Sequence, residues 1–302
     1  LLKKYWDPAG IRILLNTESK TYSFEGLSVE CVHPANKNDP YGKRMLNALS
    51  HVTTPYVIPM LDDFFLRKEV DRELIDKIIS WMERDKHIVY FNCDCTPTYC
   101  DLETDKYPGF KRLPVGNVYT LNMQAAVWRT ERLSHYWRPN ISPWEWEEFT
   151  NLLGARSKTD KFYCVTAPQH AFCDYGYSLK GMGVHRGKWV KDDVVPLFEK
   201  EKIVIDFSQR GFLAPEGSSS APKGLRDNLK TIKPSSSLIS RCLGRKDTVR
   251  YAFFAKRNKV LGISRYAPDI LYIKYSLAAE QKRFLKRNTI RQHLTTKTER
   301  RS

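Results

Sequence analysis

Strand-like and helix-like segments alternate along the first hundred residues, and this alternation limits the fold more than any other feature. Short apolar runs typical of strands are followed by stretches in which apolar residues recur at helical spacing, most clearly in residues 70–82. Such alternation predicts an α/β domain with a mostly parallel sheet flanked by helices. We expect strands at 11–16, 27–32, 56–61, 87–92 and 161–165, helices at 41–52, 70–82, 124–136 and from Ser142 onward, and a loop-rich segment at 93–116.

The predicted strand at 56–61 ends in two adjacent carboxylates, Asp62 and Asp63. Two acids at the tip of a buried strand repel each other, and partial desolvation increases that cost. A divalent cation or a bound cationic group would relieve the repulsion, and open α/β sheets bind ligands outside the carboxyl ends of their strands. The alternative is a solvated turn that carries the Asp-Asp pair without any function.

Residues 141–148, with the sequence Ile-Ser-Pro-Trp-Glu-Trp-Glu-Glu, predict the start of a helix. Ser142 is placed to cap it, with Pro143 at the first position and Glu145 three residues after the cap. Carboxylates in a first turn gain about 0.3–1 kcal/mol each from the helix dipole, so stability alone explains them. The functional alternative is a sugar site, because flat indole rings stack on pyranose faces and Glu147 supplies a carboxylate.

A glycine-rich segment at 181–189 carries three cationic or imidazole side chains, namely His185, Arg186 and Lys188. Their charges and the backbone N–H groups of such a loop are suited to holding a diphosphate. The segment lacks the spacing of a phosphate-binding loop, so a basic surface turn is the alternative.

The net charge of +16 comes from the end of the chain. Residues 223–302 hold 21 Lys or Arg and 5 Asp or Glu, whereas the first 222 residues hold 29 of each sign. The basic charge is therefore a property of the C-terminal segment and not of the region around Asp62. Since this segment also has apolar anchors, it is suited to an anionic membrane surface, the alternative being a solvated tail.

Seven scattered cysteines argue against a disulfide framework and for a reducing compartment. A zinc site is an alternative for four candidate ligands, although their spacing fits no standard paired arrangement. These are His87, Cys93, Cys95 and Cys100. No apolar run approaches the roughly 18 residues that span a bilayer.

Taken in this order, the acidic, tryptophan-rich and basic segments give the chain a family resemblance. It resembles nucleotide-sugar-dependent glycosyltransferases of the GT-A type, particularly those that build bacterial surface polysaccharides. The resemblance rests on four segments: Tyr56–Leu66, Leu121–Arg129, Pro143–Glu147 and Arg186–Trp189. It implies a GT-A-like, Rossmann-like domain over residues 1–213, whose first nucleotide-binding strand would precede Leu1. A flexible linker at 214–238 and a basic, partly helical extension at 239–302 would follow.

The resemblance also implies roles for particular residues. Asp62 and Asp63 match the acidic motif that binds Mg²⁺ or Mn²⁺ bridging the donor diphosphate. The usual motif is Asp-X-Asp, whereas Leu61 precedes the pair here, which favours Asp63 as the direct ligand. Glu147 matches the base of an inverting enzyme, and Glu145 is the second candidate.

The remaining implied roles concern the donor and the acceptor. His185 would complete the metal shell or join Arg186 and Lys188 in holding the diphosphate, while Gln124 and Trp144 would line the sugar site. The implied partners are a nucleotide-sugar donor and a glycan or lipid-linked acceptor. The implied location is the cytoplasm, peripheral to the inner face of the membrane.

Two other classes of protein share some of these features. An apolar strand that ends in Asp-Asp also occurs in polymerase palms, where paired acids hold two metals. Nucleic acid is disfavoured as a partner because the positive charge is confined to the tail. In addition, the segment Pro143–Glu147 would have no role in a nucleic-acid enzyme. The non-enzymatic alternative is a basic adaptor that binds membrane or RNA, with the α/β part as its scaffold.

Overall fold

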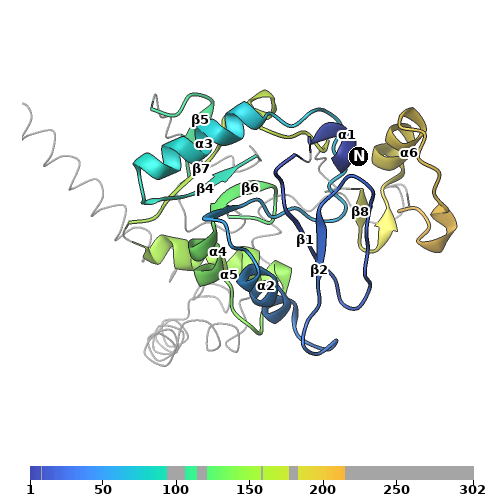
Figure 1. Cartoon of the computed structure of the whole chain (residues 1–302), viewed down its shortest axis with the longest axis horizontal. Helices are drawn as coiled ribbons and strands as arrows, with labels where there is room; N and C mark the ends of the chain where they lie inside the picture. The colour runs from blue at the N-terminus through green and yellow to red at the C-terminus, as the bar shows by residue number, and fades with distance from the viewer. Residues whose placement is uncertain (8, 94–105, 114–120, 158, 177–182, 215–302) are drawn as a thin grey trace, which may run out of the picture. The chain divides into compact units, whose positions relative to one another are not determined.

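A computed structural model describes residues 1–214 apart from residue 8 and the segments 94–105, 114–120, 158 and 177–182 (Figure 1). The side chains of 148, 149, 151–153, 155 and 156 are also outside the description. The predicted linker and basic extension therefore lie almost entirely beyond the described residues. None of the helices within the described part is long and apolar enough to cross a membrane.

A mixed five-stranded sheet forms the centre of the domain, with the strand order β3-β6-β4-β7-β5. The strands are β3 (Tyr56–Val57), β4 (Ile88–Asn92), β5 (Phe110–Arg112), β6 (Ala126–Arg129) and β7 (Lys161–Val165). Only β4 and β7 run parallel, and the other three pairings are antiparallel. The expectation of a mostly parallel sheet was therefore wrong, although the α/β class was right.

Two unexpected strands account for that difference. β6 lies within the predicted helix at 124–136, of which only α4 (Thr130–Tyr136) is helical, and β5 lies within the predicted loop at 93–116. β6 pairs with strands on both of its edges, and Val127 and Trp128 are buried on opposite faces. A short apolar run buried on both sides has no alternation that would distinguish it from a helix.

The predicted strand at 56–61 is reduced to the two residues of β3. Pro59 has no N–H to donate to a ladder, and β3 is an edge strand that pairs with β6 alone. The chain leaves the sheet at this proline, so Asp62 and Asp63 do not stand at the tip of a strand as predicted. They occupy the two central positions of a β-turn that the Phe64 N–H closes onto the Leu61 carbonyl at 3.2 Å.

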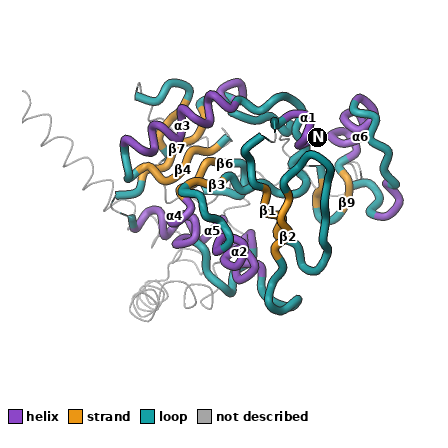
Figure 2. Tube along the Cα trace, in the orientation of Figure 1, coloured by secondary structure: helices purple, strands orange, loops and turns teal. Residues whose placement is uncertain are grey.

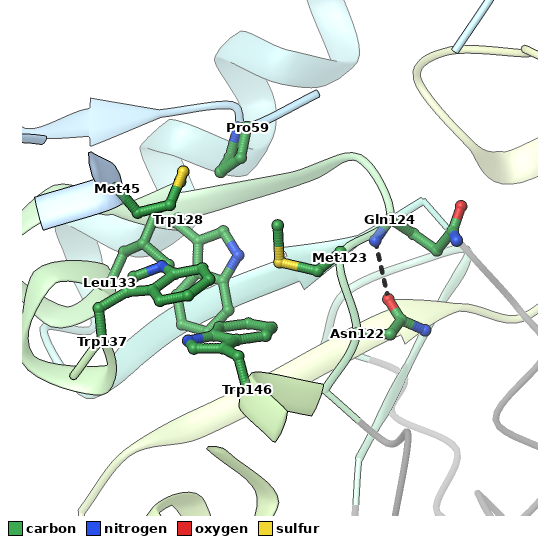
Figure 3. A pocket seen from close by; sticks show the side chains of 9 residues that line it. All are labelled: Met45, Pro59, Asn122, Met123, Gln124, Trp128, Leu133, Trp137 and Trp146. Atoms are coloured by element: carbon green, nitrogen blue, oxygen red, sulfur yellow. Dashed lines mark hydrogen bonds between the residues drawn. The ribbon is translucent and has the colours of Figure 1, made fainter. Parts of the chain in front are cut away.

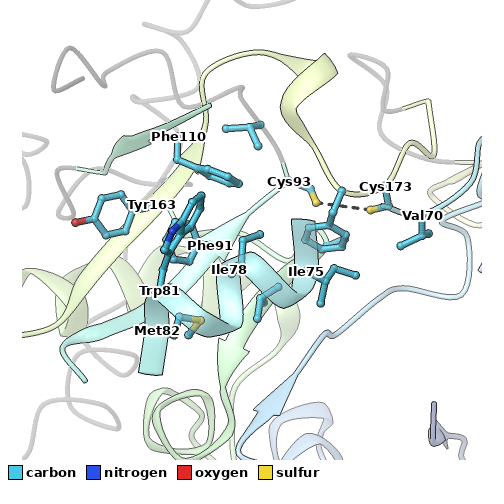
Figure 4. Packing of buried hydrophobic residues seen from close by; sticks show 14 of the residues in the cluster. Val70, Ile75, Ile78, Trp81, Met82, Phe91, Cys93, Phe110, Tyr163 and Cys173 are labelled. Carbon is cyan, nitrogen blue, oxygen red and sulfur yellow. Dashed lines mark hydrogen bonds between the residues drawn. The ribbon is translucent and has the colours of Figure 1, made fainter. Parts of the chain in front are cut away.

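Helices cover both faces of the five-stranded sheet. Successive side chains of a strand point to opposite faces, so strands that are apolar throughout need cover on both. On one face, α3 (Arg72–Arg84) packs its Trp81 ring against Phe91 of β4, with ring centroids 5.8 Å apart (Figure 4). On the other face, Trp128 of β6 meets Trp146 of α5 (Pro143–Arg156) at 6.1 Å. The α3 residues that enter the core recur at helical spacing, as predicted: Ile75, Ile78, Trp81 and Met82.

The remaining elements lie beside the central sheet (Figures 1 and 2). β1 (Ile13–Asn16) and β2 (Val29–Val32) form a separate parallel pair, and α2 (Tyr41–Ser50) contacts β1. β8 (Val184–His185) and β9 (Lys188–Trp189) form a hairpin followed by α6 (Lys191–Lys200). The shortest helices are α1 (Leu2–Tyr5) and two 3₁₀ turns, Pro168–His170 and Phe207–Gln209.

Candidate functional site

The acidic turn, defined as Asp62 and Asp63, is held against the hairpin β8–β9. The Gly183 N–H donates to the Asp63 carbonyl at 3.3 Å, and the Gly183 carbonyl accepts the Val190 N–H at 2.9 Å. A Cβ at Gly183 would lie 2.2 Å from the ring of Phe65, so any larger residue there would push the turn and hairpin apart. The two segments, about 120 residues apart in the chain, are thus joined by backbone contacts that only glycine permits.

Asp63 is half-buried in this contact, whereas Asp62 is exposed. Burial raises the pKa of Asp63 to about 6, and the neighbouring Asp62 charge adds to the increase, while the Val184 N–H and Arg210 oppose it. The repulsion expected between the two acids is therefore present, although the pair lies in a turn. A carboxylate that is costly to ionise is one that a bound cation would stabilise.

The two carboxylates have the chemistry that a hard divalent cation requires, since Mg²⁺ and Mn²⁺ prefer oxygen ligands and retain water or phosphate oxygens. No group of three His, Cys, Asp or Glu side chains able to hold a metal occurs in the described part of the chain. Asp62 and Asp63 are the candidate ligands for such a cation in the acidic turn.

The three predicted diphosphate residues all lie on the hairpin. His185 and Lys188 are paired across β8 and β9, and Arg186 and Gly187 form the two-residue turn between them. Both turn residues have positive φ, 50° and 78°, as the preferred type of two-residue hairpin turn requires. Arg186 and Lys188 are exposed and His185 is half-buried, so the structure brings all three to the element that contacts Asp63.

A buried polar cluster lies at the carboxyl end of β4. Asn122 is its centre: its Oδ1 accepts from Asn92 Nδ2 at 3.0 Å and from the Gln124 N–H at 3.2 Å. Gln124, only 7% exposed, in turn accepts the hydroxyl of Tyr175 at 2.8 Å. The cluster thus unites residues from three segments that are distant in the chain.

Glu147 reaches the same cluster from α5. The side chain is 8% exposed, and its carboxylate accepts the N–H of Met123, between Asn122 and Gln124, at 2.8 Å. The structure therefore brings together Glu147 and Gln124, which were predicted for one site from separate segments. A carboxylate that is held by a backbone N–H has a fixed orientation, which proton transfer to a positioned base requires.

Glu145 and Trp144 have different surroundings. The Ser142 N–H donates to the Glu145 carboxylate at 2.8 Å, and the Glu145 N–H donates to the Ser142 hydroxyl at 3.2 Å, a reciprocal capping box. This pairing explains the presence of Glu145 by helix stability. Trp144 is 68% exposed and its ring is available to a ligand, whereas Trp146 is buried.

A small pocket adjoins the polar cluster, and Figure 3 shows the side chains around it. Asn122 and Gln124 form its polar side, and three tryptophans belong to its apolar wall. The full lining is Met45, Pro59, Asn122, Met123, Gln124, Trp128, Leu133, Trp137 and Trp146. The enclosed space accommodates about one water molecule, so a sugar that contacts Gln124 would have to approach from outside this pocket.

An aromatic stack joins the acidic turn to the polar cluster. Phe64, the residue after the turn, stacks on Tyr175 with ring centroids 4.4 Å apart and an interplanar angle of 2°. Tyr175 then donates its hydroxyl to Gln124. Sequence reasoning missed Tyr175, Asn92 and Asn122, because their importance comes from tertiary contacts. Only Asn92 had a local signal, as a polar residue that ends a fully buried strand.

The structure separates two of the four residues considered for a zinc site, His87 and Cys93. Cys93 is buried, and its Sγ lies 3.6 Å from that of Cys173, while Cys95 and Cys100 lie outside the described residues. His87 precedes β4 and Cys93 follows it, a separation of about 20 Å at 3.3 Å per residue. His87 and Cys93 therefore cannot bind the same ion.

Comparison of the chain with protein families, with curated proteins and with solved structures finds no match.

Proposed function

We propose that this protein is a metal-assisted glycosyltransferase that moves a sugar from a nucleoside-diphosphate donor to a hydroxyl group of a glycan or lipid-linked acceptor. The observation that carries the proposal is the half-buried Asp63, beside Asp62, whose backbone carbonyl accepts the N–H of Gly183 at the start of the hairpin that carries Arg186 and Lys188. A metal-bound diphosphate complements this surface, since its cation matches the acids and its phosphates match Arg186 and Lys188.

The proposal gives each group a role. Mg²⁺ or Mn²⁺, when bound, would neutralise charge on the leaving nucleoside diphosphate. Asp63 would be the main ligand for the ion because the turn fixes its backbone against β8. Glu147 would take the proton from the acceptor hydroxyl, with its carboxylate oriented by the Met123 N–H. The exposed ring of Trp144 would stack on the acceptor sugar.

The basic segment after residue 223 would bring the enzyme to an anionic membrane surface, where lipid-linked acceptors are found.

Donor binding by the full chain tests the proposal. A panel of nucleoside-diphosphate sugars is added with Mn²⁺, and thermal unfolding is measured for the wild type, for Asp63→Asn and for Asp76→Asn. Asp76 is an exposed acid on α3 and controls for the loss of one charge. We expect at least one donor to stabilise the wild type and Asp76→Asn but not Asp63→Asn. Glu147→Gln should keep donor binding and lose transfer by about 10²–10⁴-fold. If no donor raises the unfolding temperature of the wild type, the proposal is refuted.

A further inference from the structure

Two buried cysteines face each other just beyond the end of β4. The thiol of Cys173 donates to the Sγ of Cys93 at 3.6 Å, and Figure 4 shows the two sulfurs directed toward one another. The two residues are only 7% and 5% exposed, although 80 positions separate them in the chain. A disulfide holds its sulfurs about 2.0 Å apart, so an approach of about 1.5 Å would join this pair.

The chain around Cys173 is held by backbone hydrogen bonds on both sides. The carbonyl of Phe172 accepts the N–H of Asp71, and the carbonyl of Asp174 accepts the N–H of Arg67, both at 2.8 Å. These bonds fix the backbone that carries the thiol. The position of Cys173 is therefore set by the fold.

Cys93 is fixed beside the polar cluster. Its N–H donates to the carbonyl of Ala125, the residue after Gln124, at 2.9 Å. Tyr175, two residues after Cys173, donates its hydroxyl to the side chain of Gln124 at 2.8 Å. A bond between the two sulfurs would therefore join covalently the segments that already meet through Tyr175 and Gln124.

We propose that Cys93 and Cys173 are a reversible redox pair, which closes to a disulfide by exchange with a small-molecule disulfide and so fixes Tyr175 on the polar cluster. One cysteine thiolate attacks a sulfur of the small disulfide, which forms a mixed disulfide and releases one thiol. The second cysteine thiolate then attacks the sulfur of the first, which forms the protein disulfide and releases the second thiol. Two protein thiols are oxidised, the small disulfide is reduced, and the two cysteine protons end on the released thiols.

The surroundings of the pair make this exchange slow in the folded chain. Burial raises the pKa of the Cys93 thiol, and the neighbouring Cys173 adds to the increase, while the N–H groups of Cys173 and Phe172 oppose it. The reactive thiolate is therefore scarce, and exchange proceeds through local opening of the structure. It requires neither a metal nor a sugar donor, so it succeeds or fails independently of the proposed function.

The test equilibrates the full chain with reduced and oxidised glutathione, starting from the native protein and, separately, by refolding from urea. Refolding exposes every thiol, so access does not limit the second route. Free thiols are then blocked, and linked peptides are identified by mass spectrometry without reduction. We expect a linkage between Cys93 and Cys173 that a reducing agent reverses. The equilibrium constant for its formation should be about 10- to 1,000-fold higher in the native chain than in urea, since a disulfide that favours the fold is favoured by it.

Hydrogen–deuterium exchange tests whether the bond fixes the segment that carries Tyr175. The backbone amides of residues 171–176 should exchange more slowly in the oxidised chain than in the reduced chain. Cys173→Ser should remove both the linkage and this slowing. Cys164→Ala, which removes another fully buried cysteine, from β7, should retain both.

Three results would overturn the inference. The first is the absence of a Cys93–Cys173 linkage by either route, or the linkage of Cys93 to a different cysteine. The second is an equilibrium constant that is no higher in the native chain than in urea. The third is a linkage that leaves the exchange of residues 171–176 unchanged, which would mean that the bond does not fix Tyr175. The wild-type chain alone supplies all three measurements, so the outcome does not depend on the folding of a variant.

Discussion

Replacing Asp63 with Asn should stabilise the protein when no metal is present and destabilise it relative to the wild type when metal saturates the site. Asn has the shape of Asp and its Oδ1 can still accept a hydrogen bond from the Val184 N–H, which is among the groups that favour the ionised carboxyl. The substitution therefore removes the buried charge while leaving the turn intact. The charge is the cost, because burial and Asp62 both raise the pKa of Asp63.

The magnitude follows from the difference between the ordinary pKa of 3.8 and the value of about 6 in the folded chain. An acid whose pKa is raised by folding gives stability that is fully present below pH 3.8 and is lost as the pH rises through about 6. For a fully buried group, this difference would correspond to about 3 kcal/mol. Since the carboxyl is only half-buried, solvent screening reduces this to about 1–2 kcal/mol.

Urea denaturation at several pH values, in a metal chelator or with Mn²⁺, measures this free energy of unfolding. In chelator at pH 7.5, the free energy of unfolding of Asp63→Asn should be about 1–2 kcal/mol higher than that of the wild type. This difference should vanish near pH 4. With Mn²⁺ at 100 times its dissociation constant, the wild type alone should gain about 2.7 kcal/mol, which reverses the order of stability. Asp76→Asn, the exposed control, should show neither effect.

Two results would refute this reasoning. A loss of stability for Asp63→Asn in chelator would mean that the carboxylate is already compensated by protein groups and needs no cation. A difference between variant and wild type that does not change from pH 4 to pH 8 would mean that the ionisation of Asp63 is not its source.

Three other substitutions test the parts of the structure around the site. Tyr175→Phe keeps the stack on Phe64 but removes the hydroxyl from Gln124, and it should cost about 1–3 kcal/mol in urea denaturation because the amide loses a buried partner. Ser142→Ala breaks the capping box and should lower the free energy of unfolding by about 0.5–2 kcal/mol in the same measurement. A loss of Mn²⁺ affinity in this variant would contradict a purely structural role for Ser142. Ile78→Ala opens a cavity at a fully buried position of α3 and should lower the free energy of unfolding by about 2–5 kcal/mol, so a change below 1 kcal/mol would contradict the packing of this helix.

Elements with a strong local pattern were predicted correctly. The apolar spacing that predicted a helix at 70–82 matches α3, and the capping sequence at Ser142 matches the start of α5. The strands predicted at 11–16 and 27–32 appear as β1 and β2, slightly shortened. The two helix features are decided by interactions between residues close in the chain, which is why the sequence contains their signal.

Sheet pairing had no such signal. β6 was predicted as part of a helix because its apolar run is short and buried on both faces, and its place between β3 and β4 depends on partners at 56–57 and 88–92. The same limit applied to the acidic turn. Its two carboxylates and their mutual repulsion were visible in the sequence, but the proline that moves them off the sheet acts through the missing ladder bond.

The sequence by itself determined the kinds of chemistry that this protein has: a pair of adjacent acids, a capped helix that carries a further carboxylate, a basic glycine-rich segment and a strongly basic end. Only the tertiary structure decided which of them meet. Gly183 admits the ring of Phe65 and so brings the acidic turn to the hairpin, and Tyr175 joins Phe64 to Gln124. These contacts link residues that are far apart in the chain, and they depend on packing and burial, which no local pattern records.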